Sequence, residues 1–169
     1  MIEEKEYKFD KPGIHNTDEL MKIVKSEIDR NSNISDIIIS TTTGYTAKKA
    51  EEILGMNRKL MFCGQDISKE FSMDNSMKKY LKEKYKYFEI PRQYLKTKIG
   101  KEAVQILRSV SQGFKVCIEM LHFLENNGQM KNDEEYILIA GTLKGADTAI
   151  LVKYNNLTNY YIKQILCRP

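Results

Sequence analysis

The segment that decides the fold is "DIIISTTTGYTAKKAEEILG", residues Asp36–Gly55. It opens with a β-branched run, Ile37–Ser40, which is too short for a helix and typical of a strand buried on both faces of a parallel sheet. A hydroxyl-rich turn around Gly44 follows. The residues after the turn have helical spacing, and Gly55 is the expected C-cap. The segment therefore predicts a strand that turns directly into a helix.

Short apolar runs of the same kind recur along the chain and predict further strands. The main ones are at Lys59–Cys63, Tyr136–Ala140 and Ala149–Lys153, with further candidates at Tyr7–Phe9, Tyr87–Ile90 and Tyr160–Cys167. Because strands alternate with helical segments through the first half, we expect a three-layer α/β/α sandwich. Its sheet should be mostly parallel, with a final hairpin-like pair.

Helices are predicted where apolar residues recur three and four positions apart. One begins at Asn16, which forms a capping-box pattern with Glu19, and another begins near Ser76. From Gly100 to Gly128 the pattern is helical almost throughout, and a break at Gly113 would divide it in two.

Composition limits the class of protein. With 169 residues and 41% hydrophobic residues, the chain fits a single domain over residues 1–169. The net charge of +4 is too small to indicate nucleic-acid binding, although it would suit a small anionic ligand. The three cysteines lack metal-ligand spacing, and no apolar run reaches the length of a membrane span. We therefore expect a cytoplasmic protein with neither a metal site nor a membrane partner.

The hydroxyls of the opening segment suggest an anion site. In a parallel sheet, ligands bind beyond the carboxyl ends of the strands, and this turn lies at such an end. At the start of the following helix the backbone N–H groups lack partners, so a phosphate could accept hydrogen bonds from them and from the side chains. The alternative is that one hydroxyl merely caps the helix. The hydroxyl-bearing residues are Ser40, Thr41, Thr42, Thr43 and Thr46.

A second candidate is the loop "GTLKGADTA", Gly141–Ala149, which lies between two predicted strands. Its two glycines would let the backbone approach a ligand, and Lys144 could add a positive charge. Taken alone, however, Gly145 with Asp147 is equally typical of an ordinary β-turn, and we prefer that interpretation of the isolated segment.

Together, "FDKPGIHNTDE", "STTTGYTA", "GFKVCIE" and "GTLKGADTAILV", in this order, resemble the stand-alone proteins related to the C-terminal, allosteric domain of pyruvate kinase. In pyruvate kinase the Ser/Thr-rich turn and the glycine loop hold the phosphates of a sugar bisphosphate. The resemblance implies a similar fold, and for some stand-alone relatives a bound flavin mononucleotide (FMN). It implies three groups of binding residues here: Thr41, Thr42, Thr43, Gly44, Tyr45 and Thr46; Gly141, Gly145, Ala146, Asp147 and Thr148; and, at the pocket border, Lys11, Asn16 and Thr17.

The helical segment after Arg108 carries a stripe of polar residues. Arg108, Gln112, Lys115, Glu119 and His122 recur at spacings of four and three, which would align a base, an acid and an imidazole. We interpret them as the polar stripe of an amphipathic helix, and Cys117, among apolar neighbours, as a core thiol. No catalytic residue is therefore predicted.

Three functions remain open from the sequence. The first is a non-catalytic binding or regulatory domain for a phosphorylated small molecule, with FMN as the leading candidate. The second is a flavin-dependent oxidoreductase, which would need a donor such as Lys115 or Cys117 near the ring. The third is an oligomeric protein-interaction domain without a ligand, since the resemblance makes a homo-oligomer plausible. Pyruvate kinase activity is not expected, because the resemblance covers only the regulatory part.

Overall fold

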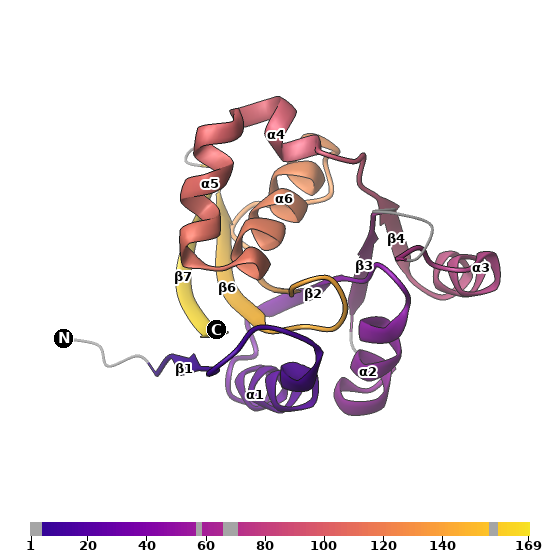
Figure 1. Cartoon of the computed structure of the whole chain (residues 1–169). Helices are drawn as coiled ribbons and strands as arrows, with labels where there is room; N and C mark the ends of the chain where they lie inside the picture. The colour runs from indigo at the N-terminus through magenta and orange to yellow at the C-terminus, as the bar shows by residue number, and fades with distance from the viewer. Residues whose placement is uncertain (1–4, 57–58, 66–70, 156–158) are drawn as a thin grey trace.

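A computed structural model describes residues 5–56, 59–65, 71–155 and 159–169. In this part of the chain, seven strands form one sheet in the order β1-β7-β6-β5-β2-β3-β4 (Figure 1). β2, β3, β4 and β5 run parallel, β6 is antiparallel to both of its neighbours, and β1 is parallel to β7. The strands are β1 (Tyr7–Lys8), β2 (Ile34–Ser40), β3 (Leu60–Gly64), β4 (Lys86–Glu89), β5 (Glu135–Ala140), β6 (Thr148–Asn155) and β7 (Asn159–Arg168).

This arrangement confirms the predicted α/β fold with a mostly parallel sheet. Each of the four main strands predicted from the sequence is present, and β6 and β7 form the final antiparallel pair. β2 lies between β3 and β5, and its isoleucines are buried alternately on the two faces. Ile37 and Ile39 belong to one apolar cluster, whereas Ile38 belongs to the other. The unbroken isoleucine run therefore reflects burial on both sides, as expected for a central parallel strand.

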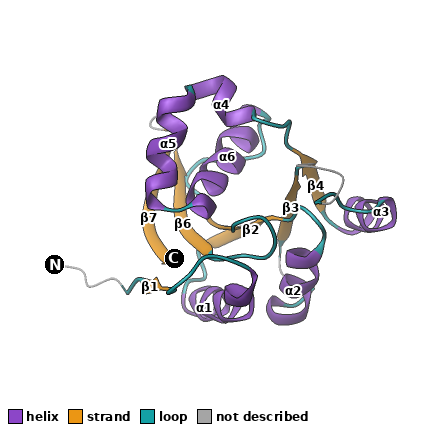
Figure 2. Cartoon of the chain, in the orientation of Figure 1, coloured by secondary structure: helices purple, strands orange, loops and turns teal. Residues whose placement is uncertain are grey.

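Helices cover both faces of the sheet (Figure 2). α1 and α2 pack on one face and α6 on the other, while α4 and α5 contact mainly α6 and each other (Figure 1). Among the described helices, none has the length and apolar character needed to cross a membrane. They are α1 (Thr17–Arg30), α2 (Tyr45–Leu54), α3 (Asn75–Lys84), α4 (Tyr94–Ile99), α5 (Lys101–Val110) and α6 (Gln112–Asn126), and a 3-10 turn, η1 (Ile14–Asn16), precedes α1.

Three details of the helices differ from the prediction. The helical segment is interrupted at Ser111 and not at Gly113. Ser111 is extended, and its hydroxyl caps α6 by accepting the Phe114 N–H at 2.9 Å. The capping box at Asn16 is absent, since its side-chain amide donates to the Lys11 carbonyl at 2.7 Å. α4, which the sequence did not predict, occupies the segment just before α5.

Gly113 has a packing role at the point where α6 meets β6. A Cβ at this position would lie 2.3 Å from Thr148 Oγ1 and 2.9 Å from Asp147 Oδ1. The Ser111 hydroxyl lies 2.9 Å from the same Thr148 oxygen, so the start of α6 is held directly against the start of β6. Only glycine allows this approach.

We expect Gly113→Ala to lower the free energy of unfolding by about 1–3 kcal/mol, because overpacking outweighs the better helix propensity of alanine. Urea unfolding of the variant measures this change. Ser26→Ala, on the exposed face of α1, is the control and should change stability little. A Gly113→Ala protein more stable than wild type would show that the approach of α6 to β6 does not constrain the fold.

Candidate functional site

A cavity of about 680 Å³ lies at the edge of the sheet where the parallel strands β5, β2, β3 and β4 end. Loops after β5 and β2 line it, together with the end of β3, the segment after β4, and one face each of α5 and α6. The sheet topology creates this arrangement, because parallel strands end at the same edge.

The threonine turn contributes part of the wall. Ser40, Thr42, Thr43 and Thr46 line the cavity. Gly44 is the N-cap of α2, with φ 87°, and no side-chain hydrogen bond caps this helix. The structure therefore contradicts the simpler alternative, in which one hydroxyl caps α2. Thr46, in the first turn of α2, and the hydroxyl-bearing residues before the helix therefore line the same cavity.

Thr41, Gly44 and Tyr45 do not line the cavity, although the resemblance implied that they bind a ligand. Thr41 is buried, and its Oγ1 has no hydrogen-bond partner among the described residues. Tyr45 does contact one residue of the lining, because Lys144 Nζ lies 5.3 Å from the centre of its ring. Tyr45 therefore helps to position Lys144, which does line the cavity.

The loop Gly141–Ala149 divides into an exposed half and a buried half. Gly141, Gly145 and the residues between them, Lys144 included, line the cavity, whereas Ala146, Asp147 and Thr148 are buried and do not. The Asp147 carboxylate accepts the Gly13 N–H at 2.9 Å and the Thr148 hydroxyl at 2.9 Å. These residues anchor the loop, which explains their polar character without a ligand.

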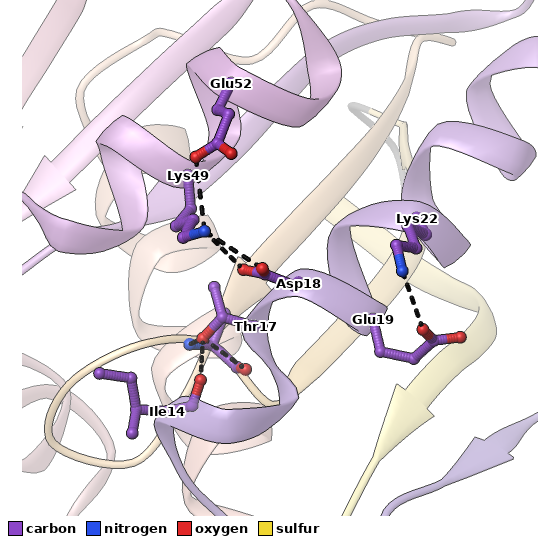
Figure 3. A network of polar contacts seen from close by, with 8 residues as sticks. Ile14, Thr17, Asp18, Glu19, Lys22, Lys49 and Glu52 are labelled. Atoms are coloured by element: carbon purple, nitrogen blue, oxygen red, sulfur yellow. Dashed lines mark hydrogen bonds and ion pairs between the residues drawn. The ribbon is translucent and has the colours of Figure 1, made fainter.

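The N-terminal segment supports the same loop from behind. Thr17 Oγ1 donates to the Ile14 carbonyl at 2.7 Å and accepts the Ala146 N–H at 3.0 Å (Figure 3). Gly145, with φ 84°, packs against η1, where a Cβ would lie 2.6 Å from Ile14 Cα. Lys11, Asn16 and Thr17, predicted at the border of the pocket, are not among the residues that line it.

The polar stripe after Arg108 lies mostly on the cavity wall, which the sequence analysis did not predict. Arg108, Gln112, Lys115 and Glu119 all line the cavity, because the turn at Ser111 folds α5 back beside α6. Lys115 is only 8% exposed and Glu119 only 2%. His122 lies outside the cavity lining, and its Nδ1 is 3.1 Å from the Tyr94 hydroxyl.

Lys115 and Glu119 form an ion pair in the cavity wall, with Nζ and Oε2 2.5 Å apart. The other carboxylate oxygen accepts the Leu95 N–H at 3.1 Å and so joins α4 to α6. Glu119 therefore neutralises one cation and fixes the position of the helices above the cavity.

Sequence reasoning missed the basic residues that precede and begin α5. Arg92, Lys96 and Lys101 line the cavity, as do Arg108, Lys115 and Lys144. Glu119 is the one carboxylate among the described lining residues. Apart from Lys115, none of these cations has an ion-pair partner within the described residues. The cavity is therefore strongly positive although the net charge of the chain is small.

Burial keeps the cysteine thiols protonated by raising their pKa. Cys63 lines the cavity but is buried, and burial raises its pKa to about 12. Cys117 is fully buried, is not part of the cavity lining, and has a pKa raised by burial, as expected of a core thiol. Within the described part of the chain, no cluster of His, Cys, Asp or Glu could hold a metal ion.

No protein-family model matches this sequence. The resemblance to the regulatory domain of pyruvate kinase therefore stays a prediction.

Thr41→Val tests whether the buried Thr41 hydroxyl serves a ligand. An unpaired buried hydroxyl is destabilising, so we expect the valine variant to unfold with a free energy about 1 kcal/mol higher than wild type. Thr148→Val is the matched control, because its hydroxyl is hydrogen-bonded and its removal should be destabilising. Urea unfolding measures both. If Thr41→Val were as destabilising as Thr148→Val, the Thr41 hydroxyl would have a partner.

Glu119→Gln tests the ion pair in the cavity wall. The Lys115 ammonium would be left buried without its partner, which should lower the free energy of unfolding by about 3 kcal/mol. Affinity for inorganic phosphate should rise, because the charge of Lys115 is no longer neutralised. Lys115→Met/Glu119→Gln is the control, since it removes both charges and keeps an acceptor for the Leu95 N–H. Most of the stability should return in the double variant. A double variant no more stable than Glu119→Gln would contradict this role.

Proposed function

We propose that the protein is a non-catalytic binding domain for a phosphorylated small molecule, with FMN as the first candidate. The observation that carries the proposal is the coincidence of three features in one cavity. The start of α2 has no side-chain cap, threonine hydroxyls line the wall beside it, and five lining cations have no ion-pair partner among the described residues. Each feature favours an anion, and together they favour a phosphate.

The threonine turn supports a phosphate on physical grounds. Backbone N–H groups in the first turn of a helix have no intrahelical partner, and the helix dipole places partial positive charge there. The hydroxyls of Thr42, Thr43 and Thr46 are further donors at the same edge of the sheet. Lys144, on the neighbouring loop, adds a full charge. Such preorganised donors bind an anion without a large net charge on the protein.

The rest of the cavity suits an organic group larger than phosphate. Ile90, Val104, Val116 and Met120 provide apolar lining. The volume of about 680 Å³ lies within the range of roughly 300–1,000 Å³ typical of small-molecule sites. A molecule with a phosphate and an aromatic ring meets both requirements, and the family resemblance implies FMN in particular.

The alternatives have less support. A flavin-dependent oxidoreductase would need a donor at the ring, and Cys117 is not part of the cavity lining. Lys115 lines the cavity but is already paired with Glu119. An interaction domain without a ligand would leave unexplained why unpaired cations gather around one cavity. We continue to expect no pyruvate kinase activity.

Removing the two hydroxyls in Thr43→Val/Thr46→Val should weaken FMN binding by at least about tenfold, because hydrogen bonds to a charged group contribute roughly 1.5–3 kcal/mol each. Calorimetric titration of FMN and of riboflavin measures the effect. Riboflavin, which lacks the phosphate, should bind wild type more weakly and respond little to the substitutions.

Thr97→Val is the control, since Thr97 lies on α4 outside the cavity lining and its hydroxyl donates to the Tyr94 carbonyl. It should leave FMN affinity unchanged. Equal affinity of wild type for the two flavins, or full FMN affinity in the double variant, would contradict the proposal.

A further inference from the structure

Leu143, on the loop after β5, is an exposed apolar residue in the lining of the cavity. Of the large hydrophobic residues that are exposed in the described part of the chain, it is the one that lines the cavity, and it is 60% exposed. The other apolar lining residues offer less surface, since Ile90, Val104 and Met120 are buried and Val116 is half-buried. Leu143 therefore provides apolar surface that a ligand could still cover.

The backbone of Leu143 is left-handed, with φ 60°. This conformation is uncommon outside glycine, asparagine and aspartate, and it is unfavourable for a bulky side chain. Among the described residues, three that are not glycine have positive φ, and two of these, Gln93 and Leu143, line the cavity. The third, Asp133, is of a type that tolerates the conformation. Strained backbone concentrates at ligand sites, where surrounding contacts enforce it.

The contacts that enforce it close the loop at its base. The Asp147 N–H donates to the Ala140 carbonyl at 3.0 Å. Gly141 lies so close to the other end of the loop that a Cβ on it would be 2.6 Å from the Gly145 carbonyl oxygen. The chain must reverse between these fixed ends, which holds Leu143 in its conformation. Leu143 is therefore positioned at the cavity before any ligand binds, and this preorganisation favours binding.

We propose that Leu143 determines specificity by contacting the uncharged part of the ligand. The inference rests on the proposed function, because a phosphate at the threonine turn would bring the ligand beside this loop. The ligand class is then a phosphate ester with an apolar or aromatic body, in preference to inorganic phosphate or a small polar ester. Asparagine or glycine would suit the backbone better, so leucine favours the complex although it destabilises the free protein.

Leu143→Asn tests the contact, because asparagine is polar, similar in size and tolerant of left-handed backbone. FMN, riboflavin and inorganic phosphate are titrated calorimetrically into wild type and variant. Both flavins should bind the variant at least about fivefold more weakly, since they share the uncharged part and lose the same apolar contact. The ratio of their affinities, and the affinity for phosphate, should not change. In urea the variant should unfold at a higher midpoint than wild type, because the strain is relieved.

Two controls separate the contact from the strain. Leu143→Met keeps an apolar side chain on the same backbone, so it should keep flavin affinity within about twofold of wild type and show no higher midpoint. Ile106→Asn makes a matching substitution at an exposed aliphatic residue of α5, outside the cavity lining and on helical backbone. It should leave flavin affinity unchanged and should not raise the midpoint.

Four results would overturn the inference: unchanged flavin affinity in Leu143→Asn, a loss confined to FMN, a loss accompanied by a lower urea midpoint, or no flavin binding to wild type. The proposed function fails separately. If riboflavin binds wild type as tightly as FMN and inorganic phosphate does not bind, the cavity is not a phosphate site. An equal loss of both flavins in Leu143→Asn would still establish the apolar contact.

Discussion

Parallel pairing of β2 with both β5 and β3 is the constraint on which the rest of the structure depends. It is stabilised by apolar burial on both faces, with Ile37 and Ile39 packed towards α1 and α2 and Ile38 towards α6. Because the strands run in one direction, the segments that leave them emerge at one edge. The threonine turn, the glycine loop and the basic segment after β4 meet there, although about a hundred residues of sequence separate the first from the last member of the lining.

The wall of the cavity depends on a second, polar layer of buried contacts. Asp147, Thr148, Thr17 and Ser111 bind one another or the backbone, and they fix the glycine loop between η1 and the start of α6. Buried polar groups without partners are costly, so a closed network of this kind holds one geometry. Several residues that were predicted to contact a ligand are therefore buried in the protein, and their neighbours line the cavity.

The fold was predictable because its signals are local. Strand β2 is visible in three consecutive isoleucines, and α2 in the helical spacing before Gly55. The threonine turn was predictable for the same reason, since a strand end, hydroxyls and a helix start are adjacent in the sequence. The role of Gly113 was misread, because its contact is with Thr148, far away in the chain.

The basic half of the site was not predictable, because it depends on tertiary folding. Lys101, Gln105 and Arg108 share one face of α5 by their spacing, but the sequence does not show what that face meets. The extended backbone at Ser111 turns α6 back beside α5, and this turn places that face of α5 at the cavity. Net charge was also uninformative: several other lysines are paired, as Lys163 is with Glu135, whereas Lys96, Lys101 and Lys144 at the cavity have no ion-pair partner among the described residues.

The central claim is that the threonine turn at the start of α2 binds a phosphate. The most direct measurement is a titration of inorganic phosphate into ¹⁵N-labelled protein, followed by amide chemical shifts. The account predicts saturable shifts of the Gly44, Tyr45 and Thr46 amides, larger than those of amides on the opposite edge of the sheet, because N–H groups that donate to an anion are deshielded. Saturable shifts elsewhere with none at these three amides would contradict it.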